Sequence, residues 1–297
     1  MKNIKMNPVL KKEMKISMRS IKSSVVVAIY LGILVLTLCG SLYLESAYRG
    51  MIIRRDATIA FVILMIIQFS LISLIAPTIT AGAISGEREK QTLDILLTTD
   101  MKFSSIITGK LYASLSRIVL LILTSIPIFI FLLSYIGINL KYAIWILIMN
   151  LITAAFVGSI GLYASTYFKK TMVATIVSYI VIFLIYVLPV IICGITQIYS
   201  ASKGMTPLVN YDRTYYYILV SPAVGFVSLI LSQLGISVES MFGSTLSLNY
   251  LGLKSYGVTA IIMIILTIIL IILATRRINP MRERRKKNKR KKEVVKS

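Results

Sequence analysis

Six long, uncharged apolar blocks alternate with connections that carry the charged residues of this part of the chain. They cover residues 25–44, 57–86, 118–140, 142–168, 171–202 and 255–275. About 20 consecutive apolar residues are enough for an α-helix to cross the hydrocarbon core of a bilayer. Every block reaches this length, so the pattern predicts an all-α membrane protein with six transmembrane helices in a domain spanning residues 25–275.

Charge decides how a seventh uncharged segment, residues 214–238, is interpreted. Basic flanks of membrane helices stay on the cytoplasmic side. The segments before residue 25 and after residue 275 are rich in lysine and arginine, so both termini are expected to be cytoplasmic and the number of spans even. With six spans, 26 basic residues lie inside and seven lie outside. Residues 214–238 then belong to an external insertion at about 203–254, where they re-enter the membrane, lie in its interface or pack on the bundle.

Composition agrees with a membrane location and disfavours several kinds of chemistry. Hydrophobic residues make up 57% of the chain and charged residues 15%, against roughly 45–50% and 25% in soluble domains. The net charge of +22 fits cytoplasmic anchoring, and no nucleic-acid partner is expected. The chain has no histidine, and the six blocks contain no Asp or Glu, which disfavours proton coupling and intramembrane proteolysis. No metal site is expected.

The first cytoplasmic segment, residues 1–24, is predicted to contain an amphipathic helix. Asn7 and Pro8 suit its N-cap and first helical position. Spacings of 4, 4 and 3 place four apolar residues on one helical face, namely Leu10, Met14, Met18 and Ile21. Lysine and arginine occupy the other side, so the helix should lie along the inner leaflet. A membrane anchor and a docking helix both fit this pattern.

The connection between the second and third spans is the other informative segment. Gly86 is predicted to end the second span, and alternating charges follow at Glu87, Arg88, Glu89 and Lys90. A short apolar stripe at helical spacing comes next, formed by Leu93, Leu96 and Leu97. Exposed leucines require either a protein partner or lipid headgroups to cover them. The stripe alone does not decide between a protein partner and lipid headgroups.

This segment also resembles a known family. The run GEREKQTLDILLTT at residues 86–99, followed by Gly109, Lys110 and Leu111, resembles the first cytoplasmic loop of ABC-2 type permeases of ATP-binding-cassette transporters. The chain departs from the family at Asp100, where many members carry proline. The resemblance implies that residues 87–99 form a coupling helix seated on a separate cytoplasmic ATPase subunit. It also implies a connecting helix at residues 10–21 and short re-entrant helices in the external insertion.

The expected function is that of a permease subunit of an exporter, paired with a second permease subunit that is identical or related. The only Gly-Lys pair, Gly109-Lys110, does not complete the G-x-x-x-x-G-K-[ST] phosphate-binding loop. The chain is therefore not expected to be an enzyme or to hold a cofactor, and ATP and Mg²⁺ are assigned to the partner ATPase. A bacterial plasma membrane is the expected location. A membrane anchor or assembly factor that transports nothing is the alternative.

Two further features predict contacts with helices and lipids. A stripe of small residues at spacings of 4, 3 and 4 consists of Ala154, Gly158, Gly161 and Ser165. Such a stripe lets another helix approach closely, either within the bundle or in a dimer. The basic tail, residues 276–297, is expected to lie against anionic membrane lipids.

Overall fold

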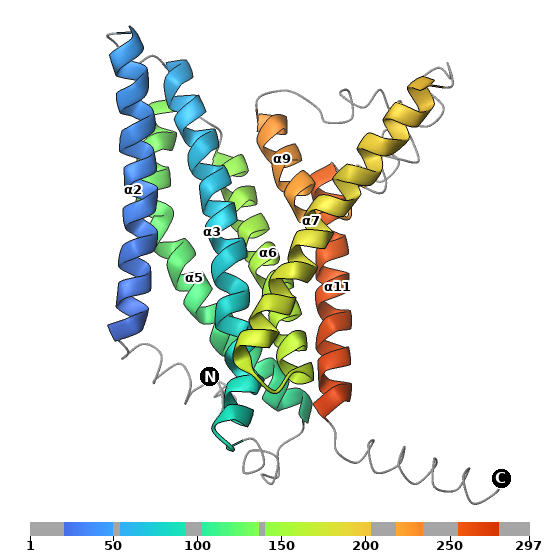
Figure 1. Cartoon of the computed structure of the whole chain (residues 1–297). Coiled ribbons are helices and arrows are strands. Elements are labelled where there is room, and N and C mark those ends of the chain that lie inside the picture. Colours follow the sequence, from blue (N-terminus) through green and yellow to red (C-terminus); the bar gives the residue numbers. More distant parts are fainter. Residues whose placement is uncertain are drawn as a thin grey trace, which may run out of the picture.

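The computed structural model describes residues 21–49, 54–92, 103–136, 140–202, 218–233 and 255–278. Within these ranges every secondary-structure element is a helix (Figure 1). The helices are α2 (Ile21–Arg49), α3 (Arg54–Glu89), α5 (Phe103–Ile136), α6 (Leu140–Tyr167), α7 (Thr171–Ser202), α9 (Pro222–Gln233) and α11 (Ser255–Ile278).

Six of these helices are long and apolar enough to cross a membrane, namely α2, α3, α5, α6, α7 and α11. This confirms the predicted number and order of spans. The helix α9, with 12 residues, is apolar but shorter than a span. The six spans alternate in direction, so the start of α2, the end of α3, the α6–α7 connection and the end of α11 lie at the same end of the bundle (Figure 1). We call this the basal end.

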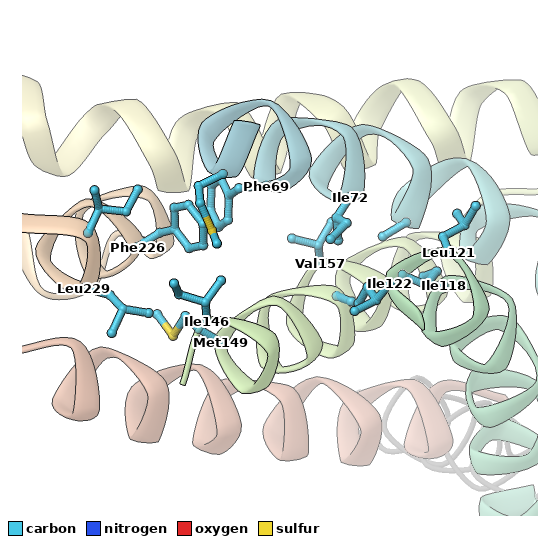
Figure 2. Close-up of a cluster of buried hydrophobic side chains, with 14 of the residues drawn as sticks. Phe69, Ile72, Ile118, Leu121, Ile122, Ile146, Met149, Val157, Phe226 and Leu229 are labelled. Atoms are coloured by element: carbon cyan, nitrogen blue, oxygen red, sulfur yellow. The ribbon is translucent and has the colours of Figure 1, made fainter. Parts of the chain in front are cut away.

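The helix α6 lies at the centre of the bundle and packs against α3, α5, α7 and α11. Apolar side chains from these helices interdigitate between them (Figure 2). Figure 2 shows Ile72 of α3 facing Val157 of α6, and both side chains are fully buried. In contrast, Tyr30 and Leu34 are the only buried residues among the described side chains of α2. The central helices therefore carry most of the internal packing, and α2 lies at the edge.

The prediction that Gly86 ends the second span is wrong, because α3 continues without a break to Glu89. Glycine inside a helix costs about 1 kcal/mol relative to alanine. Tertiary contacts on both sides of Gly86 outweigh this cost. Before it, the Ser165 hydroxyl accepts hydrogen bonds from the backbone N–H groups of Ile84 and Ser85, each at 2.8 Å. After it, charged side chains bind the neighbouring helices.

The third span also begins earlier than the apolar block predicts. The helix α5 starts at Phe103 and includes Lys110 and Arg117. A span predicted from an uncharged block stops at the first charged residue. A real helix can include charged residues where their charges are paired or reach the membrane surface. The basal part of α5 is therefore a helical extension that carries two cations.

The described part of the insertion, α9, packs on the bundle against α6, α7 and α11. Its Gly225 lies so close to α11 that an added Cβ atom would be 2.7 Å from the Cβ of Thr259. The next residue, Phe226, stacks on Phe69 of α3 with ring centroids 4.3 Å apart (Figure 2). The ring of Phe69 also stacks with that of Tyr186 of α7, with ring centroids 5.9 Å apart. The helix α9 thus contacts four spans, namely α3, α6, α7 and α11.

Candidate functional site

The end of α3 is a complete helix-capping motif. The backbone N–H of Thr92 donates to the carbonyl of Glu87 at 2.9 Å, and that of Gln91 donates to the carbonyl of Arg88 at 3.1 Å. These two bonds and a left-handed residue between them define a Schellman motif. Gln91 occupies the left-handed position with φ 57°. The motif fixes the direction in which the chain leaves α3.

Glu87 joins this motif to α5. Its carboxylate lies 2.9 Å from the Nζ atom of Lys110, whose side chain is 3% exposed. The other carboxylate oxygen accepts a hydrogen bond from the Thr92 hydroxyl at 3.1 Å. One acidic residue therefore neutralises a buried cation and also holds the turn that follows the helix.

Arg88 binds the end of α6 and the connection that follows it. Its guanidinium donates to the carbonyl of Thr166 at 2.9 Å and to the carbonyl of Phe168 at 3.4 Å. The last carbonyl groups of a helix lack partners within the helix and carry partial negative charge. A cation is favourable at this position, so Arg88 acts as a C-terminal cap for a neighbouring span.

Glu89 caps the opposite end of a helix, the N-terminus of α7, with a negative charge. Its carboxylate accepts hydrogen bonds from the backbone N–H of Thr171 at 2.8 Å and from the Thr171 hydroxyl at 2.6 Å. Thr171 is the first residue of α7. An anion at a helix N-terminus is stabilised by the unpaired N–H groups and the helix dipole.

Together these residues form one set of contacts that we call the α3-end cluster, consisting of Glu87, Arg88, Glu89, Lys110 and Thr171. Three consecutive residues of α3 each bind a different helix, namely α5, α6 and α7. A displacement of the end of α3 is therefore passed to three other spans. Among the described residues, no group of His, Cys, Asp or Glu could hold a metal ion.

The sequence-predicted coupling residues divide into two groups in the structure. Glu87, Arg88 and Glu89 lie in the last turn of α3 and bind inside the bundle, whereas Lys90 is exposed. Leu93, Leu96 and Leu97 lie outside the described residues. The same holds for Leu10, Met14 and Met18 of the predicted connecting helix, while Ile21 begins α2 with its side chain 82% exposed.

Sequence reasoning did not identify Lys110 and Thr171 as part of the cluster. Lys110 offered one signal, because it belongs to the Gly109-Lys110-Leu111 run quoted above for the family resemblance. Thr171 offered none beyond the preference of threonine for helix starts. Their pairing with α3 depends on contacts between residues 23 and 82 positions apart in the chain.

The small-residue stripe of α6 lies inside the bundle against α3, and all four of its residues are buried. A Cβ atom added at Gly161 would lie 3.2 Å from the Cα atom of Pro77, and the hydroxyl of Ser165 binds the α3 backbone. The stripe is thus an intramolecular packing surface. These contacts with α3 favour packing within the bundle over the alternative of a dimer face.

The basal end is strongly basic. Among its described residues, five basic side chains are exposed, namely Lys90, Lys169, Lys170, Arg276 and Arg277, whereas Glu89 is the one exposed acidic side chain. Arg277 of α11 lies over the ring of Tyr167 with its guanidinium carbon 4.6 Å from the ring centroid. This contact adds the last span to the helices that meet at the basal end.

Comparison with known proteins places this arrangement in a family. None of the curated proteins matches the chain. A family model described as ABC-2 family transporter protein matches residues 7–281, which include every described helix and the whole α3-end cluster. Six apolar spans and this match identify a multi-pass membrane protein that acts in transmembrane transport. The chain belongs to the ABC-2 family of transporter proteins and is a permease component of an ABC transporter.

Proposed function

We propose that this permease is the membrane subunit of an exporter whose ATP is hydrolysed by a separate cytoplasmic ATPase subunit. The observation that carries the proposal is the α3-end cluster. The segment that resembles a coupling helix, residues 87–99, begins in the last turn of α3, where Glu87, Arg88 and Glu89 bind α5, α6 and α7. Movement of an ATPase seated on that segment would reach four spans at once.

The charge distribution supports a cytoplasmic basal end. Positively charged flanks are retained on the cytoplasmic side of membrane helices. The exposed basic residues of the basal end and the basic tail at residues 276–297 follow this rule, as does the N-terminal segment that enters α2 at Ile21. We place the ATPase, with its ATP and Mg²⁺, below this end and the protein in a bacterial plasma membrane. Residues 10–21 would form the connecting helix beside it.

A second permease subunit, identical or related, would complete the transport path. Its contact surface lies outside the buried stripe of α6, because α3 covers that face. The outer part of α7 is the candidate, because its large apolar side chains are exposed, including Phe183, Leu188 and Ile195. The alternative of an anchor that transports nothing is disfavoured by membership in a transporter family.

Affinity purification of the full chain from its native membrane in mild detergent tests the proposal. We expect a stoichiometric partner that carries the G-x-x-x-x-G-K-[ST] motif, and vanadate-sensitive ATPase activity in the complex. Purification of the chain without an ATPase in several detergents would overturn the proposal and favour the anchor.

Two sets of variants separate docking from transmission. Lys90→Glu changes an exposed residue within the proposed docking segment, residues 87–99, and should reduce the amount of ATPase recovered. Lys169→Glu, an exposed residue of the α6–α7 connection, is its matched control and should leave recovery unchanged. Simultaneous charge reversal of Glu87 and Arg88 disrupts the α3-end cluster. This variant should retain the ATPase subunit but lose transport.

A further inference from the structure

A groove of about 350 Å³ lies between α5, α6 and α11. Its lining side chains come from the stretches 108–115, 151–155 and 264–271, and none of them is charged. The groove is open to the outside of the described bundle, because the lining residues Tyr112 and Ile268 are 61% and 52% exposed. All three helices are candidate membrane spans, so the opening lies at the depth of the lipid tails.

The groove has the length and the bulk of a hydrocarbon chain. Its walls on α5 and α11 are each eight residues long, which is about 10 Å along a helix that rises 1.5 Å per residue. Its volume is about twice that of a 150 Å³ apolar cavity, which accommodates benzene. The space therefore fits part of an extended acyl chain better than one ring.

The groove ends at the basal end of the bundle, where its two walls meet. Ala274 and Ile278 of α11 pack in one cluster with Ile107 and Leu111 of α5, and Leu111 also lines the groove. The start of α5 and the end of α11 lie together at this end in Figure 1. Arg276, in the last turn of α11, lies between the two packing residues of that helix. We call this end of the groove the basal rim.

The length of α11 places the basal rim at the edge of the hydrocarbon core. The helix has 24 residues, or about 36 Å, and the hydrocarbon core is about 30 Å thick. Centred in the bilayer, α11 extends about 3 Å beyond the core at each end. Arg276 lies two residues before the last residue of the helix, so its backbone is at the boundary with the headgroups.

Two polar side chains lean toward the basal rim from opposite walls. The Cα–Cβ bonds of an α-helix tilt toward its N-terminus. Because α5 starts at the basal end and α11 ends there, Tyr112 leans toward the rim and Arg276 leans back toward the groove. Both side chains are exposed, and neither has a hydrogen-bond or ion-pair partner in the part of the chain that the structure describes. Both are thus available to a ligand at the rim.

The charges around the groove favour an acidic ligand group. The helices α5, α6 and α11 contain no Asp or Glu. The last turn of α11 has two exposed basic residues, Arg276 and Arg277. Basic residues beside the ends of membrane helices attract acidic lipid headgroups. The groove therefore combines an apolar channel for a tail with a positively charged end.

We propose that this groove binds one acyl chain of an acidic phospholipid from the basal leaflet, with the phosphate at the basal rim beside Arg276 and the Tyr112 hydroxyl. A second copy of the chain fits the groove less well. Two copies related by a two-fold axis along the membrane normal meet at equal depths, so their basic rims would face and repel each other. The bound lipid would hold α5 against α11 next to Lys110, which pairs with Glu87 of the α3-end cluster.

Native mass spectrometry on the purified full chain tests the choice of lipid. The chain is titrated with an equal mixture of dioleoyl phosphatidylglycerol, which is acidic, and dioleoyl phosphatidylcholine, which has the same tails and no net charge. We expect the first bound lipid to be phosphatidylglycerol with a roughly fivefold preference, the equivalent of one basic residue near an acidic headgroup. Equal affinities for the two lipids would overturn the proposal.

Two tryptophan variants show whether the lipid lies in the groove. Ile268→Trp narrows the groove from its exposed edge and should weaken the binding of both lipids. Ile269→Trp is the matched control, because Ile269 is also exposed, lies on the same helix and does not line the groove. It should bind like the wild type. An equal loss of binding in both variants would place the lipid elsewhere and overturn the proposal.

Two neutral substitutions of basic residues test the headgroup site. Arg276→Gln should remove most of the preference for phosphatidylglycerol. Lys169→Gln is its control, because Lys169 is an exposed cation of the α6–α7 connection and lies outside the groove. Both variants keep the basic tail. Equal changes in the two variants would show that general surface charge attracts the lipid, which contradicts a specific site.

Tyr112→Phe tests the second contact of the phosphate, which the two lipids share. Loss of one hydrogen bond should weaken both lipids roughly two- to tenfold and leave the preference between them unchanged. Unchanged affinities would overturn the placement of the headgroup at the basal rim.

The same spectra also count the chains in each particle. A dimer without bound lipid that Ile268→Trp dissociates would assign the groove to a second copy and overturn the proposal. The experiment uses the chain without an ATPase, so its result does not depend on the proposed exporter function.

Discussion

Lys110 and Glu87 form an ion pair between α5 and α3 in which the two side chains differ in exposure. Their atoms Nζ and Oε1 are 2.9 Å apart, and the side chains are 3% and 28% exposed. A buried cation depends strongly on its counter-charge, because an uncompensated charge in the interior is costly. The partly exposed carboxylate depends less on the lysine. The pair is therefore asymmetric in its energetics.

This asymmetry predicts different effects for two neutral substitutions. Glu87→Gln removes the carboxylate charge that lies 2.9 Å from the buried ammonium and should lower stability by about 3 kcal/mol. Lys110→Met replaces the cation by an apolar side chain of similar length, and the glutamate retains access to water and to Thr92. Its cost should be smaller. The stability of both variants is measured by heating the protein and quantifying the remaining folded fraction by size-exclusion chromatography. A larger loss of stability in Lys110→Met than in Glu87→Gln would refute the asymmetry.

The left-handed residue at the end of α3 gives a second prediction. Gln91 has φ 57°, a conformation that costs a residue with a Cβ atom about 1 kcal/mol and costs glycine almost nothing. Gln91→Gly should therefore stabilise the chain by about 1 kcal/mol, since the side chain is exposed. Gln91→Val should destabilise it, because a β-branched residue adopts this conformation poorly. Similar unfolding temperatures for all three proteins would show that the motif does not contribute to stability.

Much of the fold follows from the sequence because bilayer physics acts locally. The thickness of the hydrocarbon core sets the length of each span, so six uncharged blocks are enough to predict six helices. The distribution of lysine and arginine adds the expectation of a cytoplasmic basal end. Neither inference requires knowledge of which helix contacts which.

The helix ends and the site contacts could not be predicted because they depend on packing between distant segments. Gly86 is a helix-ending signal by itself, and only contacts with distant segments on both sides of it show why the helix continues. In the sequence, Glu87 and Arg88 belong to a run of alternating charges that names no partner. In the structure, Glu87 binds Lys110 and Arg88 binds the end of α6. The periodicity of one helix contains no information about its register against another.

The hydroxyl of Ser165 leads to a third prediction. It accepts hydrogen bonds from two backbone N–H groups of α3, those of Ile84 and Ser85. Ser165→Ala keeps the small size of this position and removes the acceptor, so the chain should lose about 1–3 kcal/mol of stability. Ser159→Ala is the control, because Ser159 is buried on the same helix but bonds only within its own turn. Hydrogen exchange at Ile84 and Ser85 should accelerate in the first variant alone.

The glycines of the membrane helices give a graded series of alanine substitutions. At Gly161 the new Cβ atom would meet the hydroxyl of Thr80 and lie 3.2 Å from the Cα atom of Pro77, so the backbones of α3 and α6 must separate. At Gly158 the nearest atom is a methyl group of Thr80 at 3.3 Å, and the remaining contacts are ends of flexible leucine side chains. At Gly194 of α7 no atom lies within 4 Å.

Gly161→Ala should therefore destabilise the chain by about 1–3 kcal/mol, the usual cost of overpacking. Gly158→Ala should cost less, because its neighbours can rotate away, and Gly194→Ala should be neutral or slightly stabilising, because alanine is the better helix former. The midpoints of thermal unfolding in one detergent give the order of the three variants. If Gly194→Ala proved the most damaging, α7 would have to contact another chain at that position. Measuring the same series in lipid vesicles, where a second permease subunit can assemble, would reveal such a contact directly.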